Sequence, residues 1–329
     1  QKQMTRCANT ASSSASPHAN FDVLEPFSRH RRFNSSIVRD LMRDTDTQDV
    51  GRNIANCALR LRAQVVLQEG LAPEVNLKAA RVCNARLCPF CEWRRSRVWR
   101  KRLYAGLEAL WEDHPKRIGV FLTLTVKNCP LDRLGETLDD MNRAYNRMSK
   151  RSFFPTEFWF RRTEVTIGSS GPGQVVTAHP HFHVLLLVRP GYFSKNYVKQ
   201  TEWQKQWMDC ARLDYPPVVD VRRATSNSKS GSRTSDSARS AVVEAAKYTT
   251  KATELLELGD ATGEFHRQMR QRRLYAVSRP LSEYLKAGDV TAEEMLDNDT
   301  KPLPIGAEAL DVIADWFEDS NEYVITHLS

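Results

Sequence analysis

The chain has 329 residues, with 48 Lys and Arg against 40 Asp and Glu, which gives a formal net charge of +8. This length allows a substantial core and about two domains, and the positive charge favours a polyanionic partner such as nucleic acid. The sequence has neither an apolar run long enough to cross a bilayer nor an apolar segment near residue 1 typical of a signal peptide, so we expect a cytoplasmic protein with no membrane contact.

The first 36 residues predict a disordered arm. They are rich in Ser, Asn and Ala and have little periodic apolar content. The remaining chain divides on composition into residues 37–110, residues 111–285 and an acidic end.

Residues 37–110 contain a cysteine cluster. Cys83, Cys88 and Cys91 have C-x4-C-x2-C spacing, and the Cys-Pro-Phe-Cys turn lets two thiolates reach one tetrahedral ion. Structural Zn²⁺ is therefore the favoured interpretation, with Cys57 as the fourth ligand ahead of the other cysteines or a histidine. A redox C-x-x-C pair is the alternative, but the third nearby cysteine and the lack of a βαβ context argue against it.

A basic, aromatic helix is predicted directly after the cysteines. Its cations are Arg94, Arg95, Arg97, Arg100, Lys101 and Arg102. Trp93, Trp99 and Tyr104 alternate with them, and Glu92 is the one nearby acid. This composition favours contact with a phosphate backbone together with some base stacking, so residues 37–110 are interpreted as a zinc-binding, DNA-binding subdomain. A solvated charged face is the alternative.

Residues 111–285 alternate between predicted strands and helices. Segments rich in β-branched and aromatic residues predict strands at residues 117–126, 158–168, 174–188 and 217–223. Helical spacing of apolar residues predicts helices at residues 131–150, 194–213 and 240–257. The turn "GSSGPG" predicts a hairpin between the second and third strands, and the polar residues 225–240 predict a flexible loop. The sum is an α+β fold with a mostly antiparallel sheet.

The third strand contains "HPHFHVLLLV". Because side chains alternate along a strand, His179, His181 and His183 share one face. Glu164 lies across the predicted hairpin. Two neutral imidazoles and a carboxylate would form a site with open positions for Mg²⁺ or Mn²⁺ acting on a phosphate oxygen. A surface pairing of Glu164 with one of the two arginines before it, Arg161 or Arg162, is an equal alternative.

The helix "SAVVEAAKYTTKATELL" aligns three reactive groups. Glu244, Tyr248 and Lys251 stand at i, i+4 and i+7, and Lys247 lies beside the tyrosine. The lysines would favour a phenolate and hold a phosphate, which makes nucleophilic chemistry credible. Periodicity alone favours an ordinary packing role for the tyrosine.

The end of the chain is acidic. From residue 287 onwards there are eleven acidic residues and a single lysine. Residues 286–329 are therefore expected to form an accessory acidic segment.

The ordered motifs "RLCPFCEWRRS", "FLTLTV", "HPHFHVLLLV" and "EAAKYTTK" resemble those of the Rep initiator proteins of rolling-circle plasmids, which belong to the HUH endonuclease superfamily. The resemblance covers about Cys57 to Tyr284. It implies an HUH-type central antiparallel sheet flanked by helices, with an N-terminal cysteine-rich zinc-binding subdomain and a catalytic domain at residues 111–285.

The resemblance also implies roles for individual residues. His181 and His183 would be metal ligands and Glu164 would complete the site. Tyr248 would attack a DNA phosphodiester, forming a 5′-phosphotyrosyl link and freeing a 3′-OH primer. Glu244, one helical turn earlier, would activate water that hydrolyses this link and so ends the round of replication. Strand transfer is the other way in which the round can end.

Other features lie outside this motif set. His179 is expected to orient a ligand or phosphate. The expected partner is plasmid origin DNA, double- and single-stranded, and the resemblance leaves open a host helicase, a polymerase and a second Rep subunit. Two rival functions remain at this point. One is a histidine-triad-type nucleotide hydrolase, and the other is a non-catalytic zinc-dependent DNA-binding protein.

Overall fold

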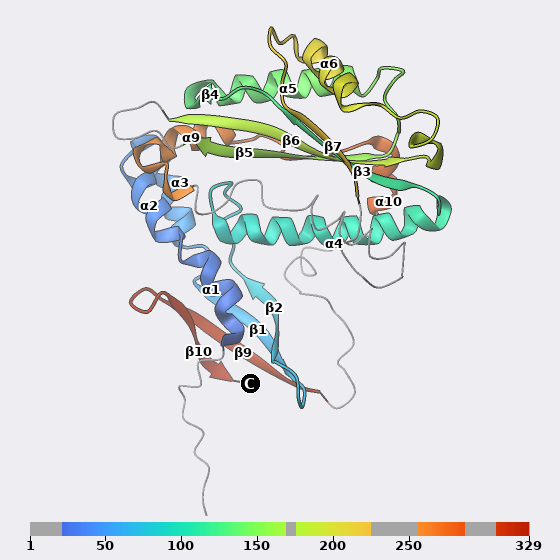
Figure 1. Cartoon of the computed structure of the whole chain (residues 1–329). Helices are drawn as coiled ribbons and strands as arrows, with labels where there is room; N and C mark the ends of the chain where they lie inside the picture. Colours follow the sequence, from blue (N-terminus) through green and yellow to red (C-terminus); the bar gives the residue numbers. More distant parts are fainter. Residues whose placement is uncertain (1–21, 169–175, 225–254, 287–306, 329) are drawn as a thin grey trace, which may run out of the picture.

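The computed structural model describes residues 22–168, 176–224, 255–286 and 307–328. Over these ranges the chain forms two antiparallel sheets joined by helices (Figure 1). The predicted α+β class is confirmed. In these ranges no helix is at once long enough and apolar enough to cross a membrane.

The smaller sheet joins the two ends of the described chain. Its strands run in the order β10-β9-β1-β2, with β1 at Arg60–Leu67, β2 at Glu74–Ala80, β9 at Glu308–Phe317 and β10 at Glu322–Leu328. Strand β9 pairs with the whole of β1 through its residues Glu308 to Asp315. The expectation of a separate acidic segment is therefore wrong for residues 308–328. Their acids alternate with apolar residues such as Val312 and Ala314, which are buried in the sheet's core.

Short helices precede this sheet. They are η1 (Asp22–Leu24), α1 (Glu25–Arg31), α2 (Asn34–Met42), η2 (Thr45–Thr47) and α3 (Gln48–Ala55). Helix α1 packs against β10 and buries Phe27. The expectation of disorder up to residue 36 is thus wrong for residues 22–36, because a few well-spaced apolar side chains are enough to bury them against the sheet. Residues 1–21 lie outside the described ranges.

A long helix, α4 (Pro89–Asp113), lies along one face of the larger sheet (Figure 1). It runs across the domain boundary expected at residue 110. Helix α10 (Arg279–Lys286) packs closely on it, since a Cβ added at Gly106 would lie 2.4 Å from a methyl carbon of Leu285. The remaining short elements on this side are η5 (Gly259–Ala261) and α9 (Thr262–Met269).

The larger sheet has the strand order β7-β3-β6-β5-β8, and the short β4 also pairs with β6. Its strands are β3 (Ile118–Thr125), β4 (Cys129–Pro130), β5 (Trp159–Gly168), β6 (Thr177–Val188), β7 (Val219–Arg223) and β8 (Tyr275–Val277). Every pairing is antiparallel, and the predicted hairpin of β5 and β6 is confirmed.

Helices cover the sheet's other face. They are η3 (Leu131–Arg133), α5 (Leu134–Met148), η4 (Pro190–Tyr192) and α6 (Gln200–Ala211). Helix α6 begins at Gln200 rather than at residue 194, because residues 194–196 form turns whose backbone N–H groups donate to the carbonyl of Gly191. Phe182 and Val184 of β6 pack into this layer with Trp207. Strand alternation then turns the odd-numbered residues of β6, histidines included, toward the α4 side.

Candidate functional site

The histidine strand and its neighbours are in register for a site on the α4 side of the sheet. Glu164 of β5 is directly opposite His181 of β6, and Arg162 is opposite His183. On β3, Thr123 is the partner of His183. Directly paired residues point to the same face, so these side chains converge.

Glu164, His181 and His183 form a three-ligand cluster. Nε2 of His183 lies 3.1 Å from Oε2 of Glu164, and Nε2 of His181 lies 3.8 Å from the same oxygen. All three ligand atoms are within 4.8 Å of one another. Ligands about 2.1 Å from one ion are separated by about 3.0–3.4 Å, so small side-chain adjustments would accommodate a divalent cation.

The other ring nitrogens are held by the protein. Nδ1 of His181 lies 3.2 Å from the carbonyl oxygen of His179, which only accepts, so this nitrogen carries the proton and Nε2 keeps its lone pair. Nδ1 of His183 lies 3.3 Å from Oγ1 of Thr123. Such contacts orient metal-binding imidazoles. His179 therefore contacts the cluster through its backbone carbonyl, while its ring lies 5.4 Å from that of His181.

The charge states suit cation binding. Burial alone would raise the pKa of Glu164, but the hydrogen bond with His183 and the charge of Arg162 bring it down to about 2. Burial, and then the charge of His183, lower the pKa of His181 to about 4. An ionised carboxylate beside a neutral imidazole is the state in which both groups can act as ligands.

Arg162 lies beneath the cluster. Its side chain is 1% exposed and donates a hydrogen bond to Glu164. The carboxylate thus pairs with Arg162 and also faces the imidazoles, so the two alternatives posed by the sequence coexist. Arg161 points to the opposite face, where its guanidinium lies 4.1 Å from the ring centre of Phe182.

The four cysteines also meet at one point. Sγ of Cys57 lies 3.5 Å from that of Cys91 and 3.6 Å from that of Cys88, and Cys83 lies 3.6 Å from Cys91. Sulfurs 2.3 Å from a tetrahedral zinc are about 3.8 Å apart, so the cluster is compatible with Zn²⁺ and the choice of Cys57 is supported.

Backbone geometry holds these thiols. The N–H of Cys83 donates to the sulfur of Cys57 at 3.4 Å, and the N–H of Asn84 donates to that of Cys91 at 3.2 Å. Hydrogen bonds from the other thiols, Cys57 first, lower the pKa of Cys91, whereas burial raises that of Cys88. Cys129 and Cys210, in β4 and α6, lie in other parts of the fold.

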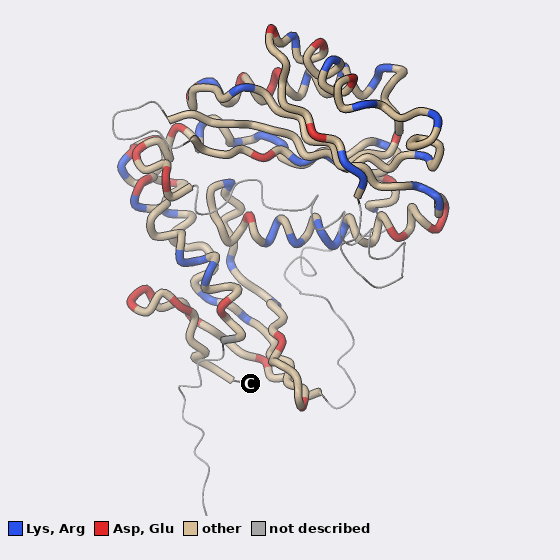
Figure 2. Tube along the Cα trace, viewed as in Figure 1, with Lys and Arg blue, Asp and Glu red and all other residues tan. Residues whose placement is uncertain are grey.

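The basic residues of α4 make contacts within the protein. Lys and Arg are concentrated in the first half of the helix, whose first turn also contains Glu92, and the other acids lie toward its end (Figure 2). Arg94 and Arg95 donate to the side chain and the backbone of Asn84, at 2.8 and 3.1 Å. Arg97 lies over Trp93 and Arg102 over Trp99. All six predicted cations, including Arg100 and Lys101, are half-buried rather than fully exposed. Their contact with DNA stays a prediction.

Four predicted catalytic residues lie outside the described ranges. These are Glu244, Lys247, Tyr248 and Lys251. Conversely, the predictions assigned no role to Thr123, which lies beside the Nδ1 atom of His183, and they treated Arg162 only as a surface partner of Glu164. The alternation of Thr with apolar residues in "FLTLTV" was the available signal for Thr123.

The fold and the two clusters define an α+β protein with two candidate metal centres, one formed by four cysteines and one on the larger sheet. A family model described as Replication protein matches residues 74–324. The chain is 30% identical to "Protein rep" of Bacillus amyloliquefaciens over 273 residues, which cover 76% of this chain and 78% of the relative.

Two further relatives agree. "Protein rep" of Lentilactobacillus hilgardii is 30% identical, covering 74% of this chain and 78% of its own length. "Replication protein" of Staphylococcus aureus is 30% identical, covering 63% of this chain and 89% of its own length. No solved structure matched the chain. The chain belongs to the Replication protein family of plasmid replication initiators, and the resemblance to Rep proteins is confirmed.

Proposed function

We propose that this protein initiates rolling-circle replication by nicking one strand at the plasmid double-strand origin, as an HUH-type endonuclease. One observation carries the proposal. In a member of a replication family, two imidazoles present Nε2 to the oxygen of one ionised carboxylate on an open antiparallel sheet. That arrangement suits a divalent cation, and the substrate expected for this family is DNA.

The cluster residues would hold Mg²⁺ or Mn²⁺, and the bound cation would polarise an oxygen of the scissile phosphate. The hydroxyl of Thr123 and the carbonyl of His179 keep the two imidazoles oriented. Arg162 keeps the Glu164 carboxylate ionised and pointed at them. These residues would thereby hold the phosphate in one orientation before the reaction.

Tyr248 is the proposed nucleophile. Its phenol loses a proton, and its oxygen forms a bond to phosphorus as the bond from phosphorus to the 3′ oxygen breaks. The 3′ oxygen leaves with the electron pair and takes up a proton, which gives the 3′-OH primer and a 5′-phosphotyrosyl link. Lys247 and Lys251 favour the phenolate by their charge.

Termination would use a second nucleophile. Either a new 3′-OH attacks the phosphotyrosyl link and rejoins the strand, or Glu244 takes a proton from water, which then hydrolyses the link. The cysteine cluster would hold Zn²⁺ and fix the start of α4, whose cations are proposed to contact DNA phosphates.

The test is a nicking assay with supercoiled plasmid carrying the origin of the chain's own plasmid and Mn²⁺. The native protein is expected to give relaxed circles and a covalent protein–DNA adduct, and Tyr248→Phe is expected to give neither. Tyr197→Phe, at a tyrosine that is 50% exposed, is the control and should behave like the native protein.

Two other results would replace the proposal. Cleavage retained by Tyr248→Phe but lost in His181→Ala or His183→Ala would indicate a histidine nucleophile, as in a histidine-triad hydrolase. Salt-dependent DNA binding without nicking under any divalent cation would indicate a zinc-dependent DNA-binding protein.

A further inference from the structure

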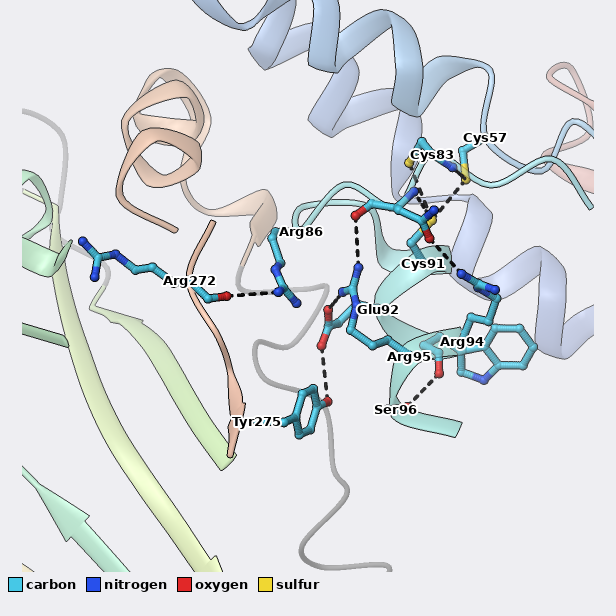
Figure 3. A network of polar contacts seen from close by, with 12 residues as sticks. Cys57, Cys83, Arg86, Cys91, Glu92, Arg94, Arg95, Ser96, Arg272 and Tyr275 are labelled. Atoms are coloured by element: carbon cyan, nitrogen blue, oxygen red, sulfur yellow. Dashed lines mark hydrogen bonds and ion pairs between the residues drawn. The ribbon is translucent and has the colours of Figure 1, made fainter. Parts of the chain in front are cut away.

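Glu92 is a buried carboxylate that the proposed chemistry does not use. It follows Cys91 in the first turn of α4 and is 5% exposed. A carboxylate buried to this extent must be compensated by charged or hydrogen-bonding partners. Its partners lie on both sides of the boundary between α4 and the large sheet, as Figure 3 shows.

On the side of the cysteines, Glu92 belongs to a closed ring of contacts. Arg95 donates to one oxygen of Glu92 and also, at 3.1 Å, to the backbone carbonyl of Asn84. The N–H of Asn84 in turn donates to the sulfur of Cys91 at 3.2 Å. The position of the Glu92 carboxylate therefore depends on the same short loop that positions the Cys91 sulfur.

On the side of the sheet, Glu92 contacts Tyr275 of β8. The phenol oxygen lies 3.5 Å from the other oxygen of Glu92, and the ring stacks on Trp99 of α4 with centres 5.1 Å apart. Hydroxyl and ring together attach β8 to this helix.

Tyr275 begins a polar row that crosses the sheet. It is directly opposite Arg162 of β5, and Arg162 is opposite His183 of β6. Arg162 is almost completely buried and donates to Glu164. A shift of Tyr275 would disturb the packing of Arg162, and through it the carboxylate that faces both imidazoles.

We propose that Glu92 and Tyr275 couple the two clusters, so that filling of the cysteine cluster raises the affinity of the Glu164, His181 and His183 cluster for its divalent cation. Both are positioning residues, because neither belongs to a cluster of ligand atoms. The inference rests on the proposed function in that both clusters must bind metal.

The two states of this coupling differ at the start of α4. With zinc bound, four metal–sulfur bonds fix the first turn and hold Glu92 against Tyr275. Without zinc, the four sulfurs are held by weak thiol hydrogen bonds, by the two backbone N–H donors and by the side chain of Asn34 beside Cys88. The turn is then free to loosen, and the coupling is reciprocal, so cation binding at the sheet also strengthens zinc binding.

The test measures Mn²⁺ affinity of the full chain carrying one zinc, from the electron paramagnetic resonance signal of unbound Mn²⁺. Glu92→Gln and Tyr275→Phe are each expected to weaken Mn²⁺ binding about fivefold or more, the lower end of typical coupling between sites. The double variant should bind Mn²⁺ with the same affinity as the single variant that binds it less tightly, because both residues act in one chain of contacts. Zinc stoichiometry is measured in each sample by mass spectrometry.

Tyr284→Phe is the matched control. It removes a hydroxyl that lies 2.9 Å from Asp113 at the far end of α4, and it should leave Mn²⁺ affinity unchanged. If Glu92→Gln loses zinc, Tyr275→Phe still decides, since that residue lies on the sheet and contacts no cysteine in the described structure.

The outcomes separate this inference from the proposed function. Native Mn²⁺ affinity in Tyr275→Phe, with His181→Ala abolishing binding, would overturn the coupling and leave the proposed function intact. Failure of the native protein to bind Mn²⁺ would overturn both. Equal weakening in Tyr284→Phe would show a general loosening of α4 and would also overturn the coupling.

Discussion

Thr123→Val tests whether the strand next to the histidines tunes the cation site. The substitution keeps the shape of the side chain and removes the hydroxyl that lies 3.3 Å from Nδ1 of His183. Loss of a partner that orients a metal-binding imidazole costs roughly 10- to 100-fold in metal affinity, or about 1.4–2.7 kcal/mol. The hydrogen bond is long and its surroundings are half-buried, so we expect the lower end of that range.

The control lies two residues away on the same face of β3. Thr125 lies opposite His181, but its hydroxyl donates to the carbonyl of Val218 at 2.8 Å, while Nδ1 of His181 faces the carbonyl of His179. Thr125→Val should lower the free energy of unfolding by about 1 kcal/mol and leave metal affinity unchanged. Calorimetric titration with Mn²⁺ and urea unfolding measure the two quantities separately. If Thr123→Val keeps native Mn²⁺ affinity, or Thr125→Val weakens it equally, the argument about imidazole orientation is refuted.

Three further predictions concern pH, zinc and the small sheet. The pKa of His181 is lowered from 6.5 to about 4, so between these pH values the unfolded chain binds a proton that the folded chain does not bind. The free energy of unfolding of the metal-free protein should therefore fall by up to about 3 kcal/mol as the pH falls from 6.5 to about 4. The midpoint of urea unfolding should depend less on pH in His181→Ala. Cys57→Ser should lower zinc content below one per chain and the unfolding temperature by about 5 °C or more, while Cys129→Ser keeps its zinc; full zinc in Cys57→Ser would contradict the ligand assignment. Trp316 is 8% exposed and packs against Tyr323, so Trp316→Ala should lower the free energy of unfolding by about 3–5 kcal/mol. Phe317 is 46% exposed, and Phe317→Ala should change the free energy of unfolding by about 0.5 kcal/mol or less. Equal effects of the two substitutions would contradict the packing of β9.

The sequence alone determined the features that depend on neighbouring residues. Alternation along a strand is enough to place His181 and His183 on one face, and the turn between Cys88 and Cys91 is enough to bring two sulfurs together. The strand signals and the turn between β5 and β6 were equally local, so the hairpin was predicted correctly.

Only the tertiary structure decided which distant residues meet. A slip of one position between β5 and β6 would turn Glu164 away from the histidines, and the sequence contains no local signal for that register. The same holds for Thr123 of β3, which lies opposite His183. It also holds for β9, whose acidic composition predicted an accessory segment although the strand completes the sheet of β1. Pairing of this kind is set by burial of apolar faces between segments far apart in the chain, a property that no short stretch of sequence carries by itself.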